Sequence, residues 1–210
     1  VGTKDFNDKM QWLKLFDQNH DKRRLCDKQS LKEYVGCRLN ENYTPRTIAV
    51  VNDVDDIDVE NLPERFVIKT THDSGGVKVL SKTEFIEKRV FLTEFFRSKL
   101  SVKYGYGTGE WCYMYINPRL IVEEYVNFSG NMNSDDYPPD YKFHCSDGKV
   151  IFLQYIFNRR FNPTEIIVGR NGKETDIWFD RNMRKGSGFP LPECWVEMIS
   201  IAEELSRGFK

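Results

Sequence analysis

The sequence lacks the close cysteine pairs that mark disulfide-rich secreted proteins and zinc sites. Its 210 residues contain five cysteines, an odd and widely spaced set without a CxxC pair. We therefore expect no disulfide framework and a reducing, cytoplasmic setting. The only close pair of metal-type ligands is His144 with Cys145. Adjacent residues of a strand point to opposite faces, so this pair argues against a zinc site.

An excess of charge and a long apolar run are also missing. Lysine plus arginine total 31 and aspartate plus glutamate total 32, so the net charge is −1. This balance predicts no nucleic-acid partner and no attraction to an anionic membrane. No apolar run approaches the ~20 residues of a transmembrane helix. No signal peptide is visible in the printed residues.

What the chain does contain is a series of helical and strand patterns. Periodicity and capping residues predict helices at 7–19, at 26–36 between Asp27 and Gly36, at 82–100 after Ser81, and at 190–208. Strands are predicted at 45–51, 65–71, 76–81, 118–126 and, as a hairpin around "SDGK", at 140–157. Hairpins separated by helices indicate an α+β fold with antiparallel sheets.

The stretch "FVIKTTHDSGG", residues 66–76, predicts a phosphate site. It places Lys69 at the end of an apolar strand and two glycines shortly after it. Phosphate binding needs backbone N–H groups, a glycine turn and a basic side chain. A Walker motif is absent, "GYGTG" at 105–109 is a weak dinucleotide signal, and a protein kinase has its glycine loop before the lysine. The simpler alternative is a solvent-facing lysine at a hairpin.

A second motif points to another class of enzyme. Asp53-Val54-Asp55 is a DxD triplet, which many glycosyltransferases use to hold a metal and a sugar nucleotide. Five acidic residues lie between Asp53 and Glu60, in front of Pro63. A solvated acidic loop explains such a cluster without any ligand.

Five ordered motifs extend the argument beyond single residues. They are "DFNDKMQWLKLFDQN" (5–19), "CDKQSLKEYV" (26–35), "LPERFVIKTTHDSGG" (62–76), "YGYGTGEWCYMYINPRLIVEEYV" (104–126) and "DYKFHCSDGKVIFLQ" (140–154). In this order they resemble the TupA-like ATP-grasp family, found in bacterial teichuronopeptide, capsule and surface-polysaccharide gene clusters. The resemblance implies an ATP-grasp fold of two α+β subdomains with antiparallel sheets, which close on ATP.

The same resemblance implies a division of the chain. Residues 1–62 would form an N-terminal lobe, 63–126 the small subdomain with the glycine-rich loop, and 127–210 the C-terminal subdomain. The family continues past its last helix into an "RVDFY" strand and an acidic strand that carry the magnesium ligands. This sequence ends at "LSRGFK". We therefore expect the C-terminal subdomain to be incomplete and the metal ligands to lie beyond Lys210.

The resemblance also implies roles for particular residues. Lys69 and Lys28 would contact the nucleotide phosphates. Arg159 would belong to the catalytic set, although Asn158 stands where the family often has an aspartate. The loop over the triphosphate would be formed by His72, Ser74, Gly75 and Gly76. The adenine would be bordered by Glu123, Glu124, Tyr125 and Val126, and the ribose or phosphates by Asp140 and Lys142.

The implied activity is that of an ATP-dependent carboxylate–amine ligase that uses ATP and Mg²⁺ and passes through an acyl phosphate. Its substrates would be an amino acid and a sugar acid or polymer precursor of a cell-surface polysaccharide. Peripheral association with a polysaccharide assembly complex is compatible with this activity. Two alternatives stay open: a glycosyltransferase that uses a sugar nucleotide, and a nucleotide-binding module without catalysis.

Overall fold

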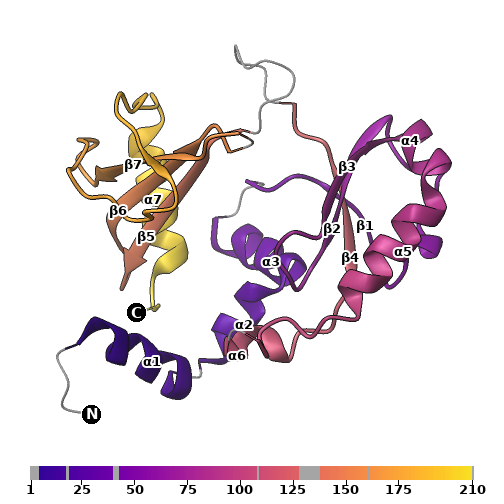
Figure 1. The fold of residues 1–210 in the computed structure, drawn as a ribbon, viewed down its shortest axis with the longest axis horizontal. Helices are drawn as coiled ribbons and strands as arrows, with labels where there is room; N and C mark the ends of the chain where they lie inside the picture. The colour runs from indigo at the N-terminus through magenta and orange to yellow at the C-terminus, as the bar shows by residue number, and fades with distance from the viewer. Residues whose placement is uncertain are drawn as a thin grey trace. The chain divides into compact units, whose positions relative to one another are not determined.

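The computed structural model describes residues 5–17, 19–39, 43–107, 109–127, 138–159 and 161–209. These residues fall into two compact units, Val1–Val126 and Asn127–Lys210, and each unit contains one four-stranded sheet with flanking helices (Figure 1). All strand pairs are antiparallel except that of β7 with β8. The predicted α+β class with antiparallel sheets is confirmed.

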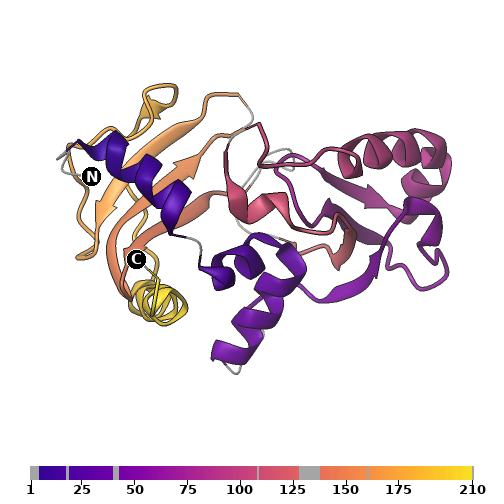
Figure 2. The same ribbon diagram turned by 90° about the horizontal axis from the view of Figure 1, so that it is seen from below.

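The first unit places helices on both sides of its sheet. Its elements are α1 (Phe6–Phe16), α2 (His20–Cys26), α3 (Lys28–Leu39), β1 (Thr47–Val51), a 3₁₀ turn η1 (Val54–Asp56), β2 (Arg65–Thr70), β3 (Val77–Ser81), α4 (Lys82–Glu87), α5 (Arg89–Leu100), α6 (Trp111–Met114) and β4 (Leu120–Glu124). The strand order is β1-β4-β2-β3. Helix α5 lies along one side of this sheet and α3 along the other (Figure 1, Figure 2).

The alternation of side chains along β2 creates two different faces. Phe66 and Ile68 point to the α5 side, where they are fully buried in a core with Phe85 and Phe96. Lys69 belongs to the other set of alternate residues and therefore points to the α3 side. The strand thus buries its apolar residues on one face and carries its lysine on the face that α3 approaches.

Several predicted helix limits are wrong. Helix α1 ends at Phe16 rather than at 19, and the last helix begins at Trp195 rather than at 190. Gly36 does not end α3, which continues to Leu39. A glycine inside a helix costs only about 1 kcal/mol relative to alanine, which is too little by itself to end a helix. The predicted helix 82–100 is divided at Lys88, which ends α4 and precedes α5. The Ser81 cap is confirmed: its side chain accepts a hydrogen bond from Glu84 N, and Glu84 reaches back to Ser81 N.

The second unit is a hairpin extended by two further strands and backed by a helix. Its elements are β5 (Asp140–Ser146), β6 (Lys149–Phe157), β7 (Thr164–Gly169), β8 (Arg184–Lys185) and α7 (Trp195–Ser206), with strand order β5-β6-β7-β8. The predicted turn is confirmed, because Asp147 and Gly148 both have positive φ, of 50° and 73°, as a two-residue hairpin turn requires. Trp195 and Ile199 of α7 pack on Tyr155 and Ile166.

Candidate functional site

The loop between β2 and β3 is tight at its base and exposed at its tip. Thr70 N donates to Gly76 O (2.9 Å), and the Thr70 hydroxyl donates to the carboxylate of Asp73. A side chain at Gly76 would collide with Thr70, so the close approach of the two strands requires glycine there. Gly75 has φ of +93°, which favours glycine for a different reason. Ser74 and Gly75 form the exposed tip.

Lys28 fastens this loop to α3. Its backbone N–H donates to Thr71 O (3.0 Å), and its ammonium donates to Thr70 O (2.7 Å) and Asp73 O (2.6 Å). Burial lowers the pKa of Lys28, and the nearby charge of Lys69 lowers it further. Because an ammonium has three N–H groups, two of these bonds leave one donor for a ligand. Its predicted contact with phosphate stays a prediction.

Lys69 shares a buried carboxylate with a lysine that sequence reasoning missed. Its ammonium lies 2.7 Å from Glu123 Oε2, and Lys32 Nζ lies 2.6 Å from Glu123 Oε1. Glu123 is only 4% exposed. Burial alone would raise the pKa of Glu123, but hydrogen bonds from Lys32 and Lys69 outweigh it and hold the pKa below its usual value. Two cations and one anion leave an excess positive charge at this place.

Spacing could have pointed to Lys32. Lys28 and Lys32 are four residues apart, so a helix places them on one face. Lys32 also donates to the carbonyl of Pro45, which precedes β1. Its side chain is 13% exposed, compared with 30% for Lys69. Of the two cations that share Glu123, Lys69 is therefore the more open to a ligand.

His72 lies inside the loop rather than at its tip. The side chain is buried, and its Nε2 lies 3.1 Å from the carbonyl oxygen of Val102. A carbonyl can only accept, so Nε2 carries the proton in this contact. Within the part of the chain that the structure describes, Nδ1 is buried without a hydrogen-bond partner. His72 thus joins the glycine loop to the segment after α5, and its predicted role over the triphosphate stays a prediction.

Two of the other residues predicted to border adenine, Glu124 and Tyr125, have protein partners of their own. The Glu124 carboxylate accepts a hydrogen bond from Arg46 N (3.0 Å) and lies 3.5 Å from Arg46 Nε. The guanidinium of Arg65 stacks over the Tyr125 ring, 4.2 Å from its centroid. Val126 is exposed at the end of the unit. The structure therefore brings Glu123 to Lys69 and leaves Glu124, Tyr125 and Val126 at the strand end.

Three predicted site residues belong to the second unit. Asp140 begins β5, Lys142 follows two residues later, and the two therefore share one face of the sheet. Arg159, just after β6, forms an ion pair with Asp140. Lys142 is exposed. The pair joins two of the predicted residues, and their contact with ribose or phosphate stays a prediction.

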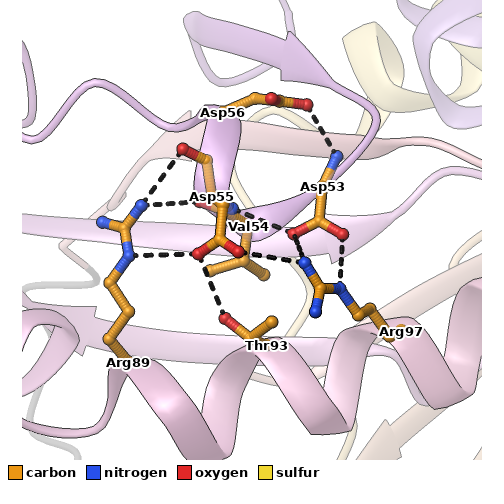
Figure 3. Close-up of polar contacts among 7 residues, drawn as sticks. All are labelled: Asp53, Val54, Asp55, Asp56, Arg89, Thr93 and Arg97. Atoms are coloured by element: carbon orange, nitrogen blue, oxygen red, sulfur yellow. Dashed lines mark hydrogen bonds and ion pairs between the residues drawn. The ribbon is translucent and has the colours of Figure 1, made fainter.

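The two carboxylates of the DxD triplet pair with two guanidinium groups (Figure 3). Asp53 accepts from Asp55 N (3.0 Å) and so caps the turn η1, and its carboxylate lies 2.6 Å from Arg97 Nε. Asp55 pairs with Arg97 (2.9 Å) and Arg89 (3.5 Å), both on α5. Hydrogen bonds from Arg97 lower the pKa of Asp53. Asp53 and Asp55 therefore link the acidic loop to α5. Asp56, Asp58 and Glu60 of the same loop are exposed.

The described residues contain no ready-made cluster of metal-binding side chains. No group of three His, Cys, Asp or Glu side chains that could hold a metal ion occurs among them. Glu123, the buried carboxylate at the glycine loop, is already neutralised by two lysines. Magnesium prefers near-octahedral oxygen ligands, usually with one or two carboxylates. The magnesium prediction therefore stays a prediction, and no step is assigned to the metal.

The comparison with known families agrees with the geometry of the first unit. Residues 8–210 match the family described as TupA-like ATPgrasp. The chain belongs to the TupA-like ATP-grasp family. Searches of curated proteins and of solved structures found no significant match. Membership implies an ATP-dependent enzyme of the ligase type. In the described part of this family member, no helix is long and apolar enough to cross a membrane.

Proposed function

We propose that the protein is an ATP-dependent carboxylate–amine ligase of cell-surface polysaccharide biosynthesis. A substrate carboxylate would attack the terminal phosphorus of ATP, ADP would leave, and an acyl phosphate would form. An amine would then attack the acyl carbon, phosphate would leave, and an amide would remain. The carboxylate would belong to a sugar acid or amino acid and the amine to an amino acid. The setting would be cytoplasmic, with peripheral association with a polysaccharide assembly complex.

The observation that carries this proposal is the lysine beside the glycine loop, whose partner carboxylate, Glu123, is shared with Lys32. Lys69 is partly exposed. Lys32 binds the other oxygen of the Glu123 carboxylate, so this single negative charge is divided between two lysines. Such a cation is suited to a group that carries several negative charges. The loop tip at Ser74 and Gly75 offers backbone next to it. Both features are those that phosphoryl transfer needs, since its catalysis is mainly positioning and charge stabilisation.

The residues would divide the work between them. Lys69 would stabilise charge on the transferred phosphoryl group. Lys28 would hold the loop base through Thr70 and Asp73, with its third N–H turned to the phosphates. Closure of the loop would exclude water, which would otherwise hydrolyse the acyl phosphate. Within the predicted division of the chain, these residues span the lobe 1–62 and the small subdomain 63–126.

The glycosyltransferase alternative has less support. Its motif would need free carboxylates to hold a metal and a diphosphate. Asp53 and Asp55 instead pair with Arg97 and Arg89, so a metal would have to displace two arginines. A binding module without catalysis would use the same lysines and glycine loop, and only turnover separates it from the ligase.

Ligand-dependent stability tests the proposal. A non-hydrolysable ATP analogue at ~100 times its dissociation constant should add about 2.7 kcal/mol to the free energy of unfolding, and UDP-glucose should add little. Lys69→Ala should lower the affinity for the analogue about ten- to a hundredfold, as expected for loss of a charged hydrogen bond. Lys78→Ala is the matched control, because Lys78 lies on β3 over the Phe95 ring, on the α5 side. Stabilisation by UDP-glucose alone would refute the ligase and favour the glycosyltransferase.

A further inference from the structure

A second basic site lies beside the glycine loop in the first unit. It is a pocket of about 410 Å³ between α2, the start of α3 and the segment that leads into β4. Arg23, Arg24 and Arg119 line it, together with a single carboxylate, that of Asp27. Helices α2 and α6 lie side by side next to it (Figure 1, Figure 2). Three guanidinium groups against one carboxylate give the pocket an excess of positive charge.

Two of the arginines are held in place by the fold. Arg23 donates to Tyr115 O (2.6 Å), and its guanidinium carbon lies 5.3 Å from the centre of the Tyr115 ring. Arg119 Nη2 lies 3.8 Å from Asp27 Oδ1, which is longer than a good charged hydrogen bond. The same oxygen of Asp27 accepts from Ser30 N (2.9 Å) and caps α3. The one anion of the pocket is therefore partly occupied, and Arg119 keeps most of its donors for a ligand.

Backbone hydrogen bonds join this pocket to the glycine loop. Thr71 N donates to Arg119 O (2.8 Å), and Arg119 N donates to the Thr71 hydroxyl (3.3 Å). Thr71 O in turn accepts from Lys28 N. Thr71 is the first residue of the glycine loop after β2. A ligand held by Arg119 would therefore lie at the sheet end from which the loop leaves.

We propose that this pocket binds the carboxylic acid substrate through an anionic group of that substrate. The guanidinium fork matches a carboxylate with two parallel hydrogen bonds, and three such groups favour an organic acid over a neutral sugar. The position beside the loop sets the acid next to the phosphates that Lys69 and Lys28 would hold. This assignment rests on the proposed ligase function and specifies where the acid substrate of that ligase binds.

Calorimetric titration of the full chain tests the pocket, with and without a non-hydrolysable ATP analogue. D-glucuronate and L-glutamate are the acid probes, and glucose and inorganic phosphate are the probes that lack a carboxylate. At least one acid should bind and glucose should not. Arg24→Gln and Arg119→Gln should each weaken acid binding about ten- to a hundredfold. Arg38→Gln, an exposed arginine of α3 outside the pocket, should leave acid binding unchanged.

The outcomes separate the pocket from the ATP site. Binding of the ATP analogue without binding of either acid would overturn the pocket and leave the ligase proposal standing. Acid binding that survives both arginine variants would place the acid elsewhere and overturn the pocket as well. Phosphate that binds as tightly as the acids, with the same arginine dependence, would overturn the carboxylate assignment. Melting curves of every variant show whether the fold is intact.

Discussion

The first unit contains two ion clusters that resemble each other in composition and differ in balance. On the α3 side, Lys32 and Lys69 share Glu123, which is buried. On the α5 side, Asp53 and Asp55 meet two arginines, and the side chain of Asp55 is 55% exposed. One cluster carries a surplus cation within a largely buried setting, and in the other each carboxylate of the DxD triplet has an arginine partner and the cluster faces water. A surplus charge beside a loop with an exposed tip is suited to a ligand, whereas an exposed cluster of paired charges mainly joins two elements.

The difference also shows why the more conspicuous motif misleads. A DxD triplet can be read directly from the sequence, but its arginine partners lie 34 to 44 residues further on. Glu123 and its two lysines come from three distant segments, and no short pattern contains them. The charge balance of a cluster depends on residues that folding brings together, so the motif alone does not decide whether its carboxylates are free.

Removal of the shared carboxylate should have the largest effect on the fold. In Glu123→Ala, Lys32 and Lys69 would face each other without an anion in a poorly hydrated place. Breaking a buried ion pair costs roughly 3–5 kcal/mol, and because Lys69 is 30% exposed we expect the lower end, about 3 kcal/mol. Urea denaturation measures this loss in the free energy of unfolding. Glu124→Ala, with an exposed partner, should cost less than about 1 kcal/mol. Equal losses in the two variants would contradict the distinction between them.

The next effect concerns ligand affinity rather than stability. In Lys32→Met, Glu123 would have Lys69 as its only cation, and the surplus charge would disappear. Affinity for the ATP analogue should fall about tenfold, equivalent to roughly 1.4 kcal/mol. Lys32→Met with Glu123→Gln should bind almost as well as the wild type, because the neutral amide releases Lys69. A structural role of Lys32 predicts no such rescue, and a double variant that binds no better than Lys32→Met would refute the surplus-charge argument.

Local signals predicted the elements that surround the site. Strand β2, the glycine loop and β3 follow from an apolar alternation and two glycines, and the Ser81 cap follows from its glutamate three residues later. Local sequence signals did not predict helix limits that depend on tertiary packing. Gly36 continues a helix that packing holds in place, and Lys88 divides a helix without any proline or glycine to mark it. The short helix α2 and the strands β7 and β8 had no pattern strong enough to predict them.

The glycine loop of the candidate site could be predicted from the sequence, but the ion pairs around it could not. Lys69 and the glycines stand together in the sequence, so their proximity needs no fold. Lys28 was assigned to phosphates, but the structure also gives it two loop carbonyls, which only the approach of α3 to the sheet could reveal. Lys32, Arg23 and Arg119 were not singled out. Their importance depends on Glu123 and on a pocket built from three separate segments.

The smallest effect is expected in the exposed cluster of paired charges. Arg97→Ala removes a side chain that is 57% exposed, and Arg89 would remain beside Asp55. Loss of Arg97 should also raise the pKa of Asp53 towards its usual value. A carboxylate with a lowered pKa contributes stability above its unfolded pKa and loses it as the pH falls, so the wild type and the variant should converge in acid. They should also converge in salt, since the screening length falls from about 10 Å at 0.1 M to about 3 Å at 1 M. Melting curves at pH 7 and pH 3, each at low and high salt, measure this difference. Affinity for the ATP analogue should not change. A clear loss of affinity in a folded Arg97→Ala protein would indicate that the DxD triplet belongs to a ligand site.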